Sequence, residues 1–91
     1  MKPDKLRAAR PIRTEVRVSG NLTLRYTLFR SGPRNRPVYS IAVTLTADRD
    51  TDYAAAFDVS RDAYRAAMLF DAVVHGTVTP CTLGDVLEDL L

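Results

Sequence analysis

The spacing of apolar residues changes once along this chain of 91 residues. Between Val16 and Val59 they recur mainly at every second position, which is the period of a strand with one buried face. From Ala63 onward they recur at intervals of three and four residues, the period of an amphipathic helix. Strands that precede helices, rather than alternate with them, indicate an α+β fold. We therefore expect an antiparallel meander of three to four strands followed by two C-terminal helices packed on one face.

Turn-forming residues divide the first part of the chain into segments. A short strand is expected over 14–18, followed by a tight turn and a second strand over 22–28. The segment 31–37 contains a glycine and two prolines and is typical of a hairpin tip. The segment 39–46 alternates most regularly and is expected at the centre of the sheet. The alternation over 53–59 includes three alanines, which have low strand propensity, so the count stays at three to four strands.

The helical pattern begins after residue 60. The first helix is expected from Arg61 to His75, with Ser60 as its N-cap and Gly76 as the residue that stops it. Its buried stripe is predicted to consist of Ala63, Ala66, Ala67, Phe70, Val73 and Val74.

A second, shorter helix is expected after Thr82, which can cap it, and it spans about nine residues. A helix of that length is not stable alone in water, so its apolar stripe must dock on something. The stripe consists of Leu83, Val86, Leu87, Leu90 and Leu91. Packing on the sheet of the same chain is the favoured interpretation, and insertion into a groove of a partner protein is the alternative.

Positive and negative charges are segregated along the sequence. Residues 1–36 carry ten Lys or Arg and two acids, whereas residues 37–91 carry three Arg and nine acids, although the formal net charge is only +2. Residues 1–13 are interpreted as a basic flexible arm and residues 14–91 as a single small α+β domain. A basic block of this kind can contact nucleic acid, an acidic partner or a second copy of the chain.

The basic residues of the strands define a candidate surface. If Val16 and Val18 face the core, alternation puts Arg17 and Arg25 on the opposite face of the sheet, together with Phe29. The whole candidate binding patch comprises Arg17, Arg25, Phe29, Arg30, Arg34 and Arg36. Sheet-face nucleic-acid binders stack bases on two or more aromatic side chains, and this patch offers one. Any nucleic-acid binding here is therefore expected to be electrostatic and independent of base sequence.

An acidic turn resembles part of a calcium-binding loop but lacks its other requirements. Its three carboxylates occupy the first, third and fifth positions: Asp48, Asp50 and Asp52. The sixth position is Tyr53 where a glycine is needed, and the twelfth is Val59 where a bidentate Glu is needed. We expect a solvated hairpin turn and no metal.

The chain has one histidine, His75, and one cysteine, Cys81. These cannot form a zinc site, and as a Cys/His pair they lack a third group to orient the histidine. No phosphate-binding glycine loop or nucleophile elbow occurs. The sequence therefore predicts a protein that is not an enzyme and has no cofactor.

Membrane and secretion signals are also not found in the sequence. The longest uninterrupted apolar stretch, 66–70, is far shorter than the roughly 20 residues that span a bilayer. A single cysteine excludes an intramolecular disulfide, and no apolar signal region follows the N-terminus. A cytoplasmic location without membrane contact is expected.

Several segments carry a family resemblance. They are the strand over 39–47, DVSRD at 58–62, GTVTPCTL at 76–83 and DVLEDLL at 85–91. Together they resemble a family of small uncharacterised proteins, a domain of unknown function, from Gram-positive gut anaerobes. The resemblance is strongest over residues 37–91 and implies a compact domain in a bacterial cytosol. It transfers no active site.

These observations favour a non-catalytic protein-interaction module that is able to self-associate. Its expected partner is an unidentified protein or a second copy of the chain. The alternative is sequence-nonspecific binding of nucleic acid through the basic arm, the hairpin tip and the outer face of the sheet.

Overall fold

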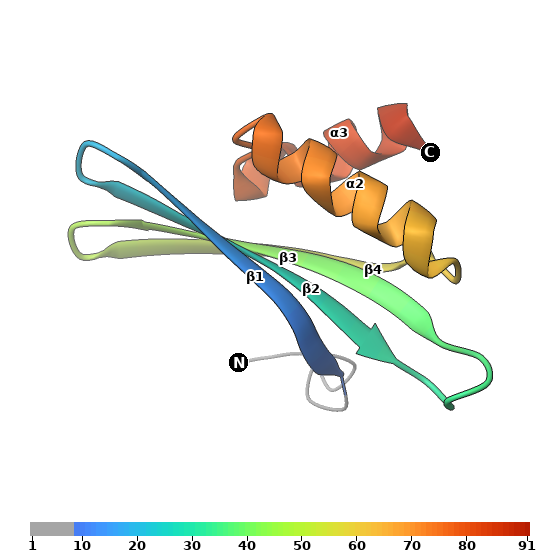
Figure 1. Ribbon diagram of the computed structural model, residues 1–91. Coiled ribbons are helices and arrows are strands. Elements are labelled where there is room, and N and C mark those ends of the chain that lie inside the picture. Colours follow the sequence, from blue (N-terminus) through green and yellow to red (C-terminus); the bar gives the residue numbers. More distant parts are fainter. Residues whose placement is uncertain (1–8) are drawn as a thin grey trace.

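The computed structural model describes residues 9–91, which form four strands, two α-helices and a short 3-10 helix (Figure 1). Neighbouring strands pair antiparallel in the order β1-β2-β3-β4. The elements are β1 Arg10–Ser19, β2 Leu22–Ser31, β3 Val38–Ala47, β4 Asp50–Ser60, α2 Ala63–His75, η1 Pro80–Thr82 and α3 Leu83–Leu90. This architecture confirms the α+β meander with two C-terminal helices, and it has four strands.

β1 begins earlier than the alternation pattern indicated. Its first residue is Arg10, four residues before the expected start at Thr14. Residues 10–13 of the expected arm are therefore paired with β2, and residues 1–8 lie outside the described part of the chain. A bulge between Pro11 and Arg13 interrupts the pairing there. Because of this bulge, the residues before Arg13 do not continue the two-residue alternation of the strand, and the sequence pattern gave no sign that β1 starts so early.

Two-residue turns set the register of the outer strand pairs. Gly20 has a φ of 60° and follows Ser19, which pairs with Leu22. Asp48 has a φ of 52° and follows Ala47, which pairs with Asp50. Both turns thus have a positive φ at the first central residue, a geometry that matches the twist of the strands. The two tips lie close together, since the Asn21 amide donates to Asp48 Oδ2 at 3.3 Å.

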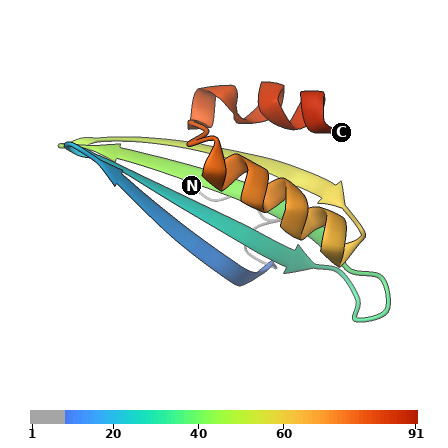
Figure 2. The ribbon, with the colours of Figure 1, turned by 45° about the horizontal axis from the view of Figure 1, so that its top comes forward.

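Both helices lie over the same face of the sheet, as Figures 1 and 2 show. The core between the layers contains six residues of β2 and β3, which are Leu24, Tyr26, Leu28, Tyr39, Ile41 and Val43. α2 contributes Ala66, Leu69, Phe70, Val73 and Val74, while Val78, Leu83 and Leu87 close the other end. Leu69 belongs to this stripe although the sequence interpretation omitted it, whereas Ala63 is exposed. The Tyr26 hydroxyl donates to the Val78 carbonyl at 2.9 Å, which ties the central sheet to the connector between the helices.

The first helix starts two residues later than expected. Asp62, not Ser60, is the N-cap, and its carboxylate accepts the Tyr64 N–H at 2.9 Å. Ser60 is the last residue of β4, and its hydroxyl accepts the Asp62 N–H at 3.0 Å. Serine and aspartate are both favoured at N-caps. Because Ser60 is still paired with Tyr39 in the sheet, the helix begins after Asp62, which becomes the N-cap.

α2 ends at His75, as expected, but Gly76 is not the residue that adopts the left-handed conformation after it. Gly76 has a φ of −79° and is the C-cap, whereas the left-handed position is taken by Thr77 with a φ of 50°. Thr77 N–H donates to Val74 O at 3.1 Å and Val78 N–H to Val73 O at 3.2 Å. These two bonds are those of a Schellman motif, whose left-handed residue is usually glycine. A β-branched residue occupies that position here.

The alternating residues over 53–59, which are Tyr53, Ala55, Phe57 and Val59, do not form one core-facing set in β4. Of these four, Val59 alone packs against the core. Ala54 pairs with Val43 and Ala56 with Ile41, so these alanines pack on the core while Tyr53 is exposed. Beyond them a bulge at Asp58, which has a φ of 55°, shifts the register. The Asp58 N–H donates to the Ser40 hydroxyl at 3.1 Å. Small side chains on this face leave room for the helices above.

Candidate functional site

β1 also presents its two faces in the opposite sense from the expected one. Arg17 pairs with Leu24, and Val16 pairs with Arg25. Because Leu24 is buried under the helices, Arg17 lies on the helix side, and Val16 and Val18 lie on the outer face. The expectation that Arg17 and Arg25 share a face is therefore wrong. Within residues 9–91, β1 pairs with β2 alone and every residue of β1 is exposed, so its valines need not enter the core.

The chemistry around Tyr26 agrees with this placement of Arg17. Burial raises the pKa of the Tyr26 phenol, and the positive charge of Arg17 partly offsets that rise. The charge of Arg17, on the helix-covered side of the edge strand, thus lowers the pKa of the phenol of a core residue.

Arg13 lies on the same side and connects β1 to α2. Its guanidinium donates to Asp71 Oδ1 at 2.9 Å and lies 4.8 Å from the centre of the Phe70 ring. Glu15, the next residue on this side of β1, is 3.9 Å from the same guanidinium. These contacts hold the middle of the edge strand against the helix layer.

The candidate patch is consequently divided among three places. Arg25 and Phe29 lie on the outer face, Arg17 and Arg30 on the helix side, and Arg34 and Arg36 in the hairpin loop. Arg30 is two residues after Leu28 in β2 and pairs with Tyr39, and both of these residues are buried under the helices, so Arg30 lies on the helix side.

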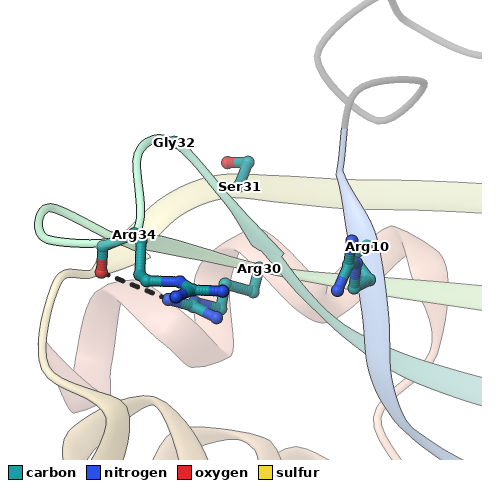
Figure 3. Close-up of a pocket in the computed structure, with 5 residues that line it drawn as sticks. All are labelled: Arg10, Arg30, Ser31, Gly32 and Arg34. Atoms are coloured by element: carbon teal, nitrogen blue, oxygen red, sulfur yellow. Dashed lines mark hydrogen bonds between the residues drawn. The ribbon is translucent and has the colours of Figure 1, made fainter.

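Three arginines line one pocket where β1 begins, near the β2–β3 hairpin, and the side chains of Arg30 and Arg34 lie beside each other there (Figure 3). Arg10, Arg30 and Arg34 line a pocket of about 250 Å³ together with Ser31 and Gly32. We call this the arginine pocket. Arg10 and Arg30 are direct partners in the register of β1 and β2, so their side chains leave the same face of the sheet side by side. Arg10 belongs to the segment 1–13 that the sequence predicts as an arm. The bulge between Pro11 and Arg13 interrupts the alternation, so the sequence pattern does not show which face of β1 Arg10 lies on.

The hairpin loop is shaped so that Arg34 folds back toward the sheet. Gly32 has a φ of 84°, and a Cβ at that position would lie 2.9 Å from the Arg36 carbonyl oxygen. The Arg36 N–H donates to Pro33 O at 2.9 Å and closes the turn. Arg30 Nη2 then donates to the Arg34 carbonyl at 3.3 Å. The loop can keep this shape only with glycine at position 32.

Among the described residues, no carboxylate compensates the charges of the arginine pocket. Within residues 9–91, none of the three arginines forms an ion pair. Such a concentration of guanidinium groups can bind an oxyanion through paired N–H donors.

The outer face of the sheet has a different character. Its register-paired positions are Val18, Thr23, Thr46 and Thr51; Val16, Arg25, Thr44 and Tyr53; Thr14, Thr27, Ala42 and Ala55; and Pro11, Phe29 and Ser40. Arg25 is the one charged residue among these positions. Val16 and Val18 are 48% and 70% exposed, so apolar surface faces solvent beside the free edge of β1. Tyr53 is a second aromatic residue on this face, in addition to Phe29.

The candidate partner helix is largely used inside the chain. Leu83 and Leu87 are buried and Val86 packs against the core, whereas Leu90 and Leu91 are 44% and 61% exposed. Leu90 joins Tyr64 and Met68 around a hollow of about 370 Å³ between α2 and α3. Three of the five residues therefore stabilise the fold, which favours intramolecular packing over helix-in-groove binding.

The remaining reactive side chains are scattered. Cys81 is exposed, with its sulfur 3.5 Å from Thr79 Oγ1, while His75 Nδ1 lies 2.8 Å from the carbonyl of Asp71. No group of three metal-ligating side chains occurs among residues 9–91. In the same part of the chain, no helix is both long and apolar enough to cross a membrane.

Comparisons of the chain with family models, with curated proteins and with solved structures find no match.

Proposed function

We propose that this chain is a non-catalytic interaction module that self-associates by pairing the free edge of β1 with β1 of a second copy. A strand at the edge of a sheet presents unpaired N–H and C=O groups that can pair with another strand. β1 is such a strand along its whole length, and all of its residues are exposed.

The pairing segment has natural limits. Pro11 has no N–H to donate, and the bulge after it interrupts the strand up to Arg13. Ser19 ends β1 at the other side. The regular part is therefore Arg13–Ser19, which is centred on Val16. Symmetric dimers are the commonest protein assemblies, and an antiparallel pair about a two-fold axis at Val16 uses this whole segment.

The sequence of this segment complements itself in that arrangement, which is the observation that carries the proposal. On the helix side, Glu15 lies opposite Arg17 of the second copy, and the same pair forms again across the axis. On the outer face, Val16 lies opposite Val16 of the second copy, and Val18 lies opposite its Thr14. Opposite charges and β-branched pairs directly across strands are both stabilising.

A charge-exchange series tests this proposal by sedimentation equilibrium at low ionic strength. The wild-type chain of 10.1 kDa is expected to approach twice that mass as its concentration rises. Glu15→Arg and Arg17→Glu each bring like charges together twice and should weaken the dimer about tenfold. The double variant exchanges the partners and should restore it.

Two controls separate the interface from the fold. Arg49→Glu makes the same change of charge as Arg17→Glu but lies at the β3–β4 turn, and it should leave the dimer unchanged. Thermal unfolding of each variant is needed because Glu15 also lies near Arg13 of its own chain. A wild-type chain that stays monomeric at millimolar concentration contradicts the proposal, as does a double variant that is weaker than both single ones.

Sequence-nonspecific nucleic-acid binding is the second candidate. It has less support, because the outer face carries one charged residue, Arg25, at its paired positions. Binding that neutralises several phosphates needs several cations on one surface.

A further inference from the structure

The arginine pocket lies outside the segment used for self-association. We infer that it binds a phosphate group of a small anionic ligand. Arg10, Arg30 and Arg34 are contributed by β1, β2 and the β2–β3 loop, so the pocket exists only in the folded sheet.

The pairing of Arg10 with Arg30 is the first observation behind this assignment. Like charges directly opposite each other on neighbouring strands destabilise a sheet. Here Arg10 and Arg30 are register partners on neighbouring strands, and within residues 9–91 no carboxylate forms an ion pair with either. An anion between them converts this repulsion into two favourable interactions.

The position of Arg34 is the second observation. Its carbonyl accepts a hydrogen bond from Arg30 Nη2, and the glycine turn at Gly32 keeps the loop folded back over the strand end (Figure 3). This partial organisation lowers the cost of ordering the side chains on binding. Guanidinium forks match the spacing of phosphate oxygens and donate to them in pairs.

The size of the pocket limits the ligand. Its volume of about 250 Å³ is below the roughly 300–1,000 Å³ of pockets that enclose drug-sized molecules. A phosphate or diphosphate group fills such a space, and the rest of a larger ligand would remain outside it.

Isothermal titration with sodium pyrophosphate, at constant ionic strength and with acetate as the comparison anion, tests the inference on the full chain. Wild-type protein should bind pyrophosphate with one saturable site and should unfold at a higher temperature in its presence. Arg30→Gln and Arg34→Gln should each weaken binding by about tenfold or more, which is the usual effect of losing a hydrogen bond to a charged group. Arg49→Gln, at the far turn, removes the same charge and should have no effect.

The stability of the variants without ligand provides a second measurement. Arg30→Gln removes one of two like charges on register partners, and it also removes the exposed hydrogen bond to the Arg34 carbonyl. These effects oppose each other, so its unfolding temperature without pyrophosphate should stay close to that of the wild type. Loss of binding then cannot result from loss of fold. Equal weakening by Arg30→Gln and Arg49→Gln, or no pyrophosphate binding at 10 mM, would overturn the inference.

A single-stranded ten-nucleotide DNA distinguishes the source of the phosphate. If the chain binds this DNA but not pyrophosphate, the arginines track a nucleic-acid backbone and the small-ligand inference is wrong. If it binds pyrophosphate with the variant pattern above, the inference holds whether or not the chain dimerises.

Discussion

The guanidinium of Arg13 and the carboxylate of Asp71 lie 2.9 Å apart and join the edge strand to the first helix across 58 residues of sequence. The same guanidinium covers the Phe70 ring. This contact adds a side-chain link to the backbone pairing with β2 that holds β1 in the sheet, although β1 buries none of its own residues.

Removing this contact should weaken the domain modestly. Both side chains are partly exposed, so Arg13→Ala should lower the free energy of unfolding by about 1 kcal/mol, from the ion pair and the ring contact together. Urea denaturation measures this value. A double-mutant cycle with Asp71→Asn should give a coupling energy that decreases with added salt, whereas a salt-independent coupling would mean that the ion pair contributes nothing.

The hydrogen bond from Tyr26 to Val78 O should contribute more. Tyr26→Phe leaves a buried carbonyl without its donor and should cost about 1–2 kcal/mol. Tyr39→Phe is the matched control, because Tyr39 is buried and no described residue accepts a hydrogen bond from its hydroxyl. Equal losses for the two variants would show that the hydroxyl of Tyr26 is not the cause.

Burial of Tyr26 also predicts a pH dependence. The pKa of this phenol is raised above its ordinary value of 10.0, so the folded protein favours the neutral form. The resulting stability is fully present below pH 10 and is lost as the pH rises through the raised pKa of the folded state. Chemical denaturation between pH 9 and 12 should therefore show a decline that is smaller in Tyr26→Phe. An identical decline in both proteins would assign it to other groups.

The left-handed residue after α2 offers a stabilising substitution. Thr77 has a φ of 50°, which is strained for a β-branched side chain and free for glycine. Thr77→Gly should raise the free energy of unfolding by about 1 kcal/mol. Thr46→Gly, at an exposed position of β3, is the control and should lower it. Thermal unfolding of both variants decides whether the gain comes from the backbone conformation.

Two leucines of α3, Leu87 and Leu90, should respond differently to replacement by alanine. Leu87 is 3% exposed, so Leu87→Ala should cost about 2–4 kcal/mol. Leu90→Ala removes an exposed side chain and should change stability by less than about 0.5 kcal/mol. Similar costs at both positions would show that Leu90 is also buried in solution, as in an assembly that covers the end of this helix.

Some features of the candidate site could be predicted from the sequence, and others could not. The hairpin loop containing Arg34 and Arg36 was predicted, since glycine and proline mark turns regardless of their surroundings. The placement of Arg17 was wrong because alternation distinguishes two faces without telling which of them is covered. The pocket formed by Arg10 and Arg30 was missed because it depends on a bulge and a cross-strand register, which join residues 20 positions apart.

The sequence by itself determined the elements of this protein, because period and turn chemistry are local properties. Three strands, two helices and their order follow from the alternation, from Gly20 and Gly32 at the turns, and from the change of period after Ser60, whereas the fourth strand was left open by its alanines. Only the tertiary structure decided which side of β1 and β4 faces the helices. Those two strands form the edges of the sheet, where the helices cover the side chains only partly. Apolar residues can therefore lie on either face there, and their positions in the sequence do not show which face is covered. The two-residue turns and the pairing with β2 and β3 set the register there, so the tertiary structure also determined where the charges meet.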